Sequence, residues 1–105
     1  MIVYDHSRKI IKVKTGEKFG VRLLSNPTTG YSWRLARPVK KELCKLLGKK
    51  FHPPENKPAG AGGEEIWFFQ AIRAVEITIS LEYVRPWEKD PSPLRKKEFI
   101  VRARN

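Results

Sequence analysis

Residues 75–84, VEITISLEYV, alternate between apolar and polar side chains over almost their whole length. One face of this segment carries only apolar residues, namely Val75, Ile77, Ile79, Leu81 and Tyr83. Successive side chains of a β-strand point to opposite faces, so the alternation predicts a strand with one face in a core and the other in water.

The rest of the chain repeats this pattern in shorter pieces rich in β-branched and aromatic residues. Further strands are predicted at about residues 9–14, 18–24, 31–37, 50–53, 65–71 and 97–104. Turn-forming residues separate them, as in NPTTG at 26–30 and RPWEKDPSP at 85–93. The chain is therefore predicted to be all-β, an antiparallel β-sandwich of about seven strands.

One segment departs from the strand pattern. In PVKKELCKLLGKK, residues 38–50, the apolar residues Val39, Leu43, Leu46 and Leu47 recur at helical spacing. Pro38 precedes this stripe and Gly48 follows it, so the segment predicts one short helical turn.

A length of 105 residues is close to that of an average domain, so we expect residues 1–105 to form a single one. No apolar run approaches the roughly 20 residues of a membrane span, and the N-terminus lacks the apolar core of an export signal. We therefore expect a cytoplasmic protein as the sequence is written, or a secreted or periplasmic one if an N-terminal segment has been removed.

The residues that could carry chemistry are few. A single cysteine, Cys44, excludes an internal disulfide, and with only His6 and His52 it makes no convincing zinc site. Cys44 adjoins the apolar stripe and is expected to be packed in the interior rather than to act as a nucleophile. No catalytic triad or carboxylate pair stands out, so we expect neither an enzyme nor a cofactor.

The formal net charge is +11, from 22 lysines and arginines against 11 aspartates and glutamates. A charge this large favours an acidic partner, which could be nucleic acid, an anionic surface or an acidic protein. A well-solvated basic surface without a partner is the plainer alternative.

If the strands run alternately up and down, three connections emerge at the same end of the sandwich. These are residues 25–30, 54–64 and 85–96, and they contain nearly all of the unusual loop residues. Taken singly, each has an ordinary interpretation: a tight turn, a flexible glycine-rich loop, and a tryptophan that is either exposed or buried. Functional residues concentrate on loops held by a rigid scaffold, so this end is predicted to be the binding end.

Three motifs in these connections, NPTTG followed by an aromatic residue, GxGG, and RPW, resemble those of the chagasin family of protein inhibitors of papain-like cysteine proteases. The matching residues are Asn26, Pro27, Thr28, Thr29, Gly30 and Tyr31 in the first loop, Gly60, Ala61, Gly62 and Gly63 in the second, and Arg85, Pro86 and Trp87 in the third. The resemblance extends into FHPPENK before the glycines and LEYVRPW around the last motif, and so spans most of the chain.

The resemblance implies an immunoglobulin-like fold and a reversible, competitive inhibitor that blocks the protease cleft with its three loops. Thr28 and Thr29 would approach the catalytic cysteine and histidine of the protease. Residues 60–63 would lie along the substrate groove through main-chain hydrogen bonds. Trp87, with Arg85 beside it, would stack on an aromatic residue of the protease.

A basic nucleic-acid-binding β-domain is the main alternative, with cationic strands such as KIIKVK and FIVRAR and with Trp33 or Trp67 for base stacking. An adhesion or assembly module is a third possibility, but it would not need a glycine-rich loop. The inhibitor interpretation predicts a papain-like protease as partner, a monomer, no specific nucleic acid and no membrane.

Overall fold

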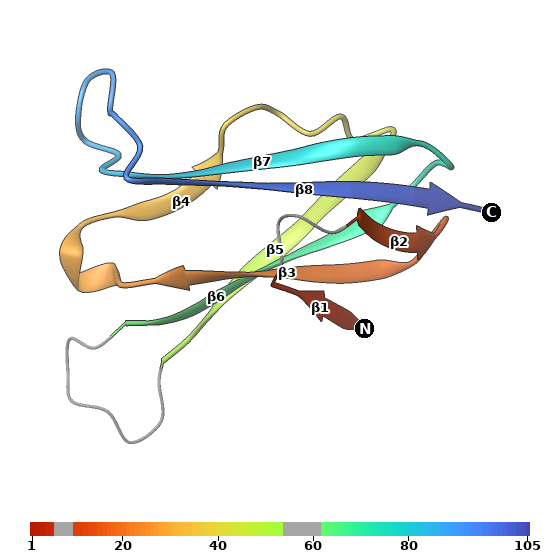
Figure 1. Cartoon of the computed structure of the whole chain (residues 1–105), viewed down its shortest axis with the longest axis horizontal. Helices are drawn as coiled ribbons and strands as arrows, with labels where there is room; N and C mark the ends of the chain where they lie inside the picture. The colour runs from red at the N-terminus through yellow and green to blue at the C-terminus, as the bar shows by residue number, and fades with distance from the viewer. Residues whose placement is uncertain (6–9, 54–61) are drawn as a thin grey trace.

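The computed structural model describes residues 1–5, 10–53 and 62–105 of the chain, and within them eight strands form two packed sheets (Figure 1). The first sheet has the order β1-β3-β6-β5, with bounds Ile2–Tyr4, Lys18–Ser25, Gly63–Ala71 and Cys44–His52. The second has the order β2-β8-β7-β4, with bounds Ile10–Lys14, Arg95–Arg104, Glu76–Val84 and Ser32–Leu35. The predicted immunoglobulin-like β-sandwich is confirmed.

Most neighbouring strands are antiparallel, as expected, but two pairs in the described chain are parallel. β1 runs parallel to β3, and β2 runs parallel to β8. The N-terminal part of the chain thus contributes one strand to each sheet. β1, which the sequence analysis did not predict, is only three residues long.

The core lies between the sheets and is built from the apolar faces that alternation predicted. Ile79 and Leu81 of β7 are almost completely buried, and Phe19 of β3 stacks on Phe69 of β6 with the ring centroids 5.7 Å apart. Burying a side chain of this size contributes about 1.5–3 kcal/mol. Packing of the two sheets therefore fixes the positions of the loops that join the strands.

The helical turn predicted within residues 38–50 is wrong. That segment forms a short turn at 41–43 followed by strand β5, Cys44–His52, which also absorbs the short strand predicted at 50–53. Leu46 and Leu47 lie on this edge strand about 40% exposed, so their helical spacing does not mark a core stripe. The helical turn that the structure contains is instead the 3-10 helix η1, Pro27–Thr29.

Candidate functional site: three loops at one end

The β3–β4 and β7–β8 connections and the described ends of the β5–β6 connection lie at one end of the sandwich, where the sequence analysis predicted all three connections. This end is on the left of Figure 1. Two contacts draw them together: Trp87 lies against Gly30, and Gly62 lies near Asn26. The β3–β4 loop is therefore in contact with both of the others. Gly60 and Ala61, predicted site residues of the middle loop, fall outside the described residues.

The β3–β4 loop is held in shape by hydrogen bonds to Asn26. The side-chain Oδ1 of Asn26 accepts hydrogen bonds from Thr28 N (3.2 Å) and Thr28 Oγ1 (2.6 Å). Its main-chain carbonyl accepts from Thr29 N (3.2 Å) and Thr29 Oγ1 (2.7 Å). Asparagine is a favoured helix N-cap because its side chain satisfies main-chain N–H groups in this way. Pro27, with its fixed φ, occupies the first helical position after it.

The predicted rigid, polar loop is thus present, but its threonines are not free donors. Both residues are exposed, and both hydroxyl hydrogens are donated to Asn26 within the loop. A hydroxyl has one hydrogen and two acceptor positions, so each oxygen keeps acceptor capacity. The tip consequently offers acceptors and methyl groups to an approaching partner.

A stack of side chains connects this loop to the third loop and to the core. Trp33 is buried and lies against Tyr83 (4.9 Å between ring centroids), Tyr83 stacks on Tyr31 (5.3 Å), and the Arg85 guanidinium sits over Tyr31 (4.7 Å). The Tyr83 hydroxyl accepts a hydrogen bond from Asn26 N (2.9 Å). Tyr83 therefore fixes the base of both loops, a role that the sequence analysis missed. Tyr83 was predicted to lie on the buried face of its strand, and a buried tyrosine hydroxyl usually forms a hydrogen bond, so such a bond could have been expected.

Trp87 resolves one of the alternatives that the sequence left open, because its side chain is 67% exposed. The Cη2 edge of its indole lies against Gly30, and a side chain on Gly30 would overlap it. Gly30 also has a φ of +83°, a conformation that costs other residues energy. Glycine at this position thus leaves room for the edge of the Trp87 indole to pack against the first loop.

The two described glycines of the middle loop differ in their surroundings. A Cβ on Gly63 would overlap His52 O and come within 2.8 Å of the Phe51 ring. A Cβ on Gly62 would meet its nearest atom, Ser25 O, at 3.4 Å, which is an ordinary contact. Gly63 is therefore required by packing within the fold, whereas Gly62 is exposed and has room for a side chain.

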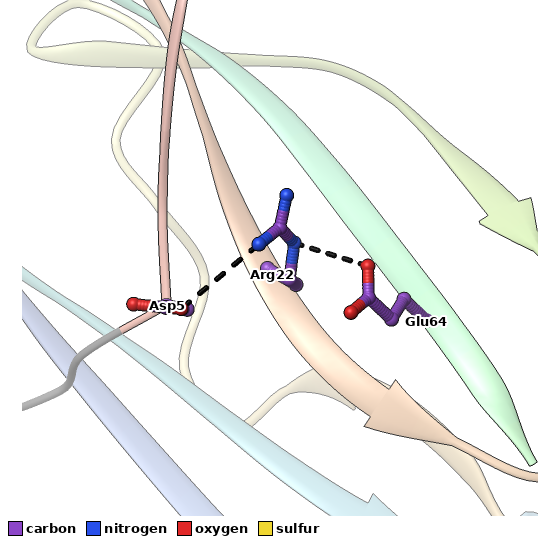
Figure 2. A network of polar contacts seen from close by, with 3 residues as sticks. All are labelled: Asp5, Arg22 and Glu64. Atoms are coloured by element: carbon purple, nitrogen blue, oxygen red, sulfur yellow. Dashed lines mark ion pairs between the residues drawn. The ribbon is translucent and has the colours of Figure 1, made fainter.

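An ionic network supports the start of β6, immediately after these glycines (Figure 2). Arg22 of β3 lies between Glu64 (Nε to Oε2, 3.1 Å) and Asp5 (Nη1 to Oδ2, 3.9 Å). The Nε–Glu64 contact is close without being aligned as a hydrogen bond. All three side chains are partly exposed, so each pair contributes no more than about 1 kcal/mol. No sequence motif pointed to this network.

Other candidate groups lie away from this end or are buried. Burial raises the pKa of the Cys44 thiol to about 11, which keeps it neutral near pH 7 and confirms Cys44 as a packed residue. Trp33 and Trp67, the stacking residues of the nucleic-acid alternative, are 2% and 4% exposed. Their indole N–H groups donate within the protein, to Leu24 O and Glu65 Oε1. Across the described ranges, no three His, Cys, Asp or Glu side chains gather into a possible metal site.

The fold and the three joined loops define a β-sandwich that presents a rigid, loop-built surface at one end. Residues 12–102 match the family described as "Chagasin family peptidase inhibitor I42", and the chain belongs to this family.

The similarity extends to individual proteins. The chain is 34% identical to Chagasin of Trypanosoma cruzi over 85 residues, covering 78% of this chain and 77% of that protein. It is 30% identical to Amoebiasin-2 of Entamoeba histolytica over 105 residues, covering 92% and 77% respectively. The crystal structure of a cysteine protease inhibitor from Entamoeba histolytica has the same fold, with a TM-score of 0.70, 21% identity and coverage of 98% of this chain and 97% of that one.

Proposed function

We propose that this protein is a reversible, competitive inhibitor of papain-like cysteine proteases, and that it fills the active-site cleft with residues 25–30, 54–64 and 85–96. The observation that carries the proposal is the internally bonded β3–β4 loop, flanked by an exposed tryptophan and an exposed glycine. Membership of a family of peptidase inhibitors supports it. The protein acts by occupying a site and has no catalytic role of its own.

The β3–β4 loop enters the cleft and resists cleavage. Peptide-bond hydrolysis requires the carbonyl carbon to reach a near-attack geometry beside the nucleophile. Pro27–Thr29 form a 3-10 turn whose side chains are bonded to Asn26, so straightening the loop would break those hydrogen bonds. The hydroxyl oxygens of Thr28 and Thr29 accept hydrogen bonds from the protease, including from its protonated catalytic histidine.

Trp87 anchors one flank of the contact. Tryptophan residues often dominate interface energies because they bury a large apolar area at little conformational cost. The indole already packs against Gly30 while much of its surface is exposed, so it would lose little conformational entropy on binding. Arg85 and Tyr31 form a second, cationic contact beside it.

The glycine-rich loop covers the other flank. By resemblance, residues 60–63 bond to the protease through their main chain. Gly62 is the described residue of this set whose exposure and free space suit such a contact. A side chain there would fit the free inhibitor and would obstruct the approach of a second backbone.

Titration of active papain with the purified protein tests the proposal. We expect stoichiometric inhibition that substrate competes away, and mass spectrometry after long incubation should show an intact chain. Cleavage between Thr28 and Tyr31 with return of protease activity would identify the protein as a substrate and reject the proposal. The absence of inhibition of any papain-like protease would reject it as well.

A further inference from the structure

The end of the sandwich opposite the three loops gathers lysines and arginines that are far apart in the sequence. It is on the right of Figure 1, where the β2–β3 and β6–β7 turns and the end of β8 lie. We call the following seven residues of the described chain the basic end: Lys14, Lys18, Lys40, Lys41, Lys45, Arg73 and Arg104.

Main-chain hydrogen bonds hold the segments of the basic end together. Among the bonds that link separate segments, Thr15 N donates to Arg104 O (2.8 Å), Gly16 N to Ala71 O (2.7 Å) and Ile72 N to Leu43 O (2.9 Å). The cations are therefore attached to a closed, rigid end of the fold, and their side chains extend from it into solvent.

The positive charge of the basic end is only partly offset by carboxylates of the described chain. All seven side chains are exposed, and in the described part of the chain none of them forms an ion pair. The carboxylates of Glu17 and Glu42 lie on the same turns, while Glu76 is paired with Arg102 (2.8 Å). Glu17 accepts a hydrogen bond from Lys14 N (2.8 Å) and keeps its charge, so seven cations and these two carboxylates leave an excess of five positive side-chain charges.

We propose that the basic end is a peripheral attachment site for membranes that contain anionic lipids. Clusters of four to eight lysines and arginines bind such surfaces, with about 1 kcal/mol for each cation near the membrane. Both sheets contribute to the seven cations, so the charges surround the end of the sandwich instead of following one sheet face. Ile72, 37% exposed in the β6–β7 turn, adds an apolar contact at the same end.

A single-stranded nucleic acid fits this arrangement less well. Single-stranded nucleic acids are bound by a basic groove combined with aromatic stacking platforms. Trp33 and Trp67 are buried, and the exposed Trp87 is at the opposite end of the molecule. The inhibitor interpretation predicted no membrane partner. Within the described residues no helix is long and apolar enough to cross a bilayer, and a peripheral contact requires none.

Attachment through the basic end leaves the three loops free. The molecule is 44 Å long, and its two ends are separated along this axis. Exposed charges are screened within about 8–10 Å at moderate ionic strength, so events at the two ends are electrostatically independent. The proposal does not rest on protease inhibition, and the two can be tested separately.

Vesicle binding by the whole protein and two matched variants tests the inference. The basic-end variant combines three substitutions, Lys18→Gln, Lys41→Gln and Arg73→Gln. The control variant combines three substitutions outside the basic end, Lys50→Gln, Lys96→Gln and Lys97→Gln. Each removes three exposed cations and leaves the same net charge. Sedimentation with phosphatidylcholine vesicles, with and without phosphatidylserine, measures partitioning, and a duplex DNA titration at the same salt measures the competing interaction. Circular dichroism and thermal unfolding confirm that each variant is folded.

We expect the wild-type protein and the control to bind vesicles that contain phosphatidylserine and not those of phosphatidylcholine alone. The basic-end variant should bind more weakly by a factor on the order of a hundred. An equal loss in both variants would show that net charge alone is responsible, and would overturn the proposal. Absent vesicle binding, or tighter binding to DNA than to vesicles at physiological salt, would overturn it too. Papain inhibition, assayed in parallel, bears only on the proposed function.

Discussion

The two ends of this sandwich are closed by different interactions. At the loop end, side chains bond to the main chain and rings stack on one another, as in the Asn26 hydrogen bonds and the Trp33–Tyr83–Tyr31 stack. At the basic end, main-chain hydrogen bonds link the turns while charged side chains extend into water. The first arrangement fixes a shape and the second displays charge. Shape complementarity controls the dissociation of a complex, whereas exposed charge acts mainly on association.

The largest expected effect of a single change at the loop end comes from Trp87→Ala. Papain inhibition should weaken about thirtyfold, the equivalent of about 2 kcal/mol, because an exposed anchor is lost. The melting temperature should stay unchanged, since the side chain is 67% exposed. Trp33→Ala is the matched control: this tryptophan is buried, and its loss should cost about 3–5 kcal/mol of folding stability. A fall in the melting temperature of Trp87→Ala would place Trp87 in the core and remove its assignment as an anchor.

The middle loop allows a comparison of neighbouring glycines. Gly63→Leu should lower the free energy of unfolding by about 1–3 kcal/mol, because the side chain overlaps the main chain of β5. Gly62→Leu should leave stability within about 0.5 kcal/mol and weaken papain inhibition about tenfold or more. Urea unfolding and inhibition constants measure the two effects. Unchanged inhibition by Gly62→Leu would make this loop a simple surface connection.

A smaller effect is expected where the loop end meets the core. Tyr83→Phe removes the hydroxyl that accepts from Asn26 N and should cost about 1–2 kcal/mol of stability. Inhibition should weaken as well, because the β3–β4 loop loses its link to the stack. Tyr31→Phe keeps the stacked ring and should be nearly neutral, since in the described chain the Tyr31 hydroxyl makes no hydrogen bond. Equal stabilities for the two variants would mean that stacking alone holds the loop.

The smallest effect concerns charge. Raising salt should reduce the rate of association with an acidic papain-like protease severalfold and leave dissociation almost unchanged. Cations close to the loops should contribute most, so the Lys50, Lys96, Lys97 variant should associate more slowly than the Lys18, Lys41, Arg73 variant. Stopped-flow kinetics of the two variants measures this difference. Identical association rates would show that the overall charge, and not its distance from the loops, steers the encounter.

The sequence predicted most of the fold because half-buried strands show a local alternation of apolar and polar residues. Alternation in residues 75–84 marks the inner face of β7, and NPTTG and RPW mark chain reversals between strands. The spacing of apolar residues in 38–50 wrongly predicted a helical turn, because a local helical preference is weak and strand pairing can override it. Cys44 pairs with Ala71 and His52 with Glu64, and the hydrogen bonds of that ladder are worth more than the local helical tendency.

The sequence by itself determined that the chain is a β-sandwich, that three unusual loops share one end, and that their motifs belong to one family of inhibitors. These properties depend on residues that are neighbours in the chain. Only the tertiary structure decided that Trp87 is exposed beside Gly30, that Tyr83 ties two loops to the core, and that the lysines and arginines of the basic end meet opposite the loops. Such contacts join residues tens of positions apart, and they are set by how the two sheets pack.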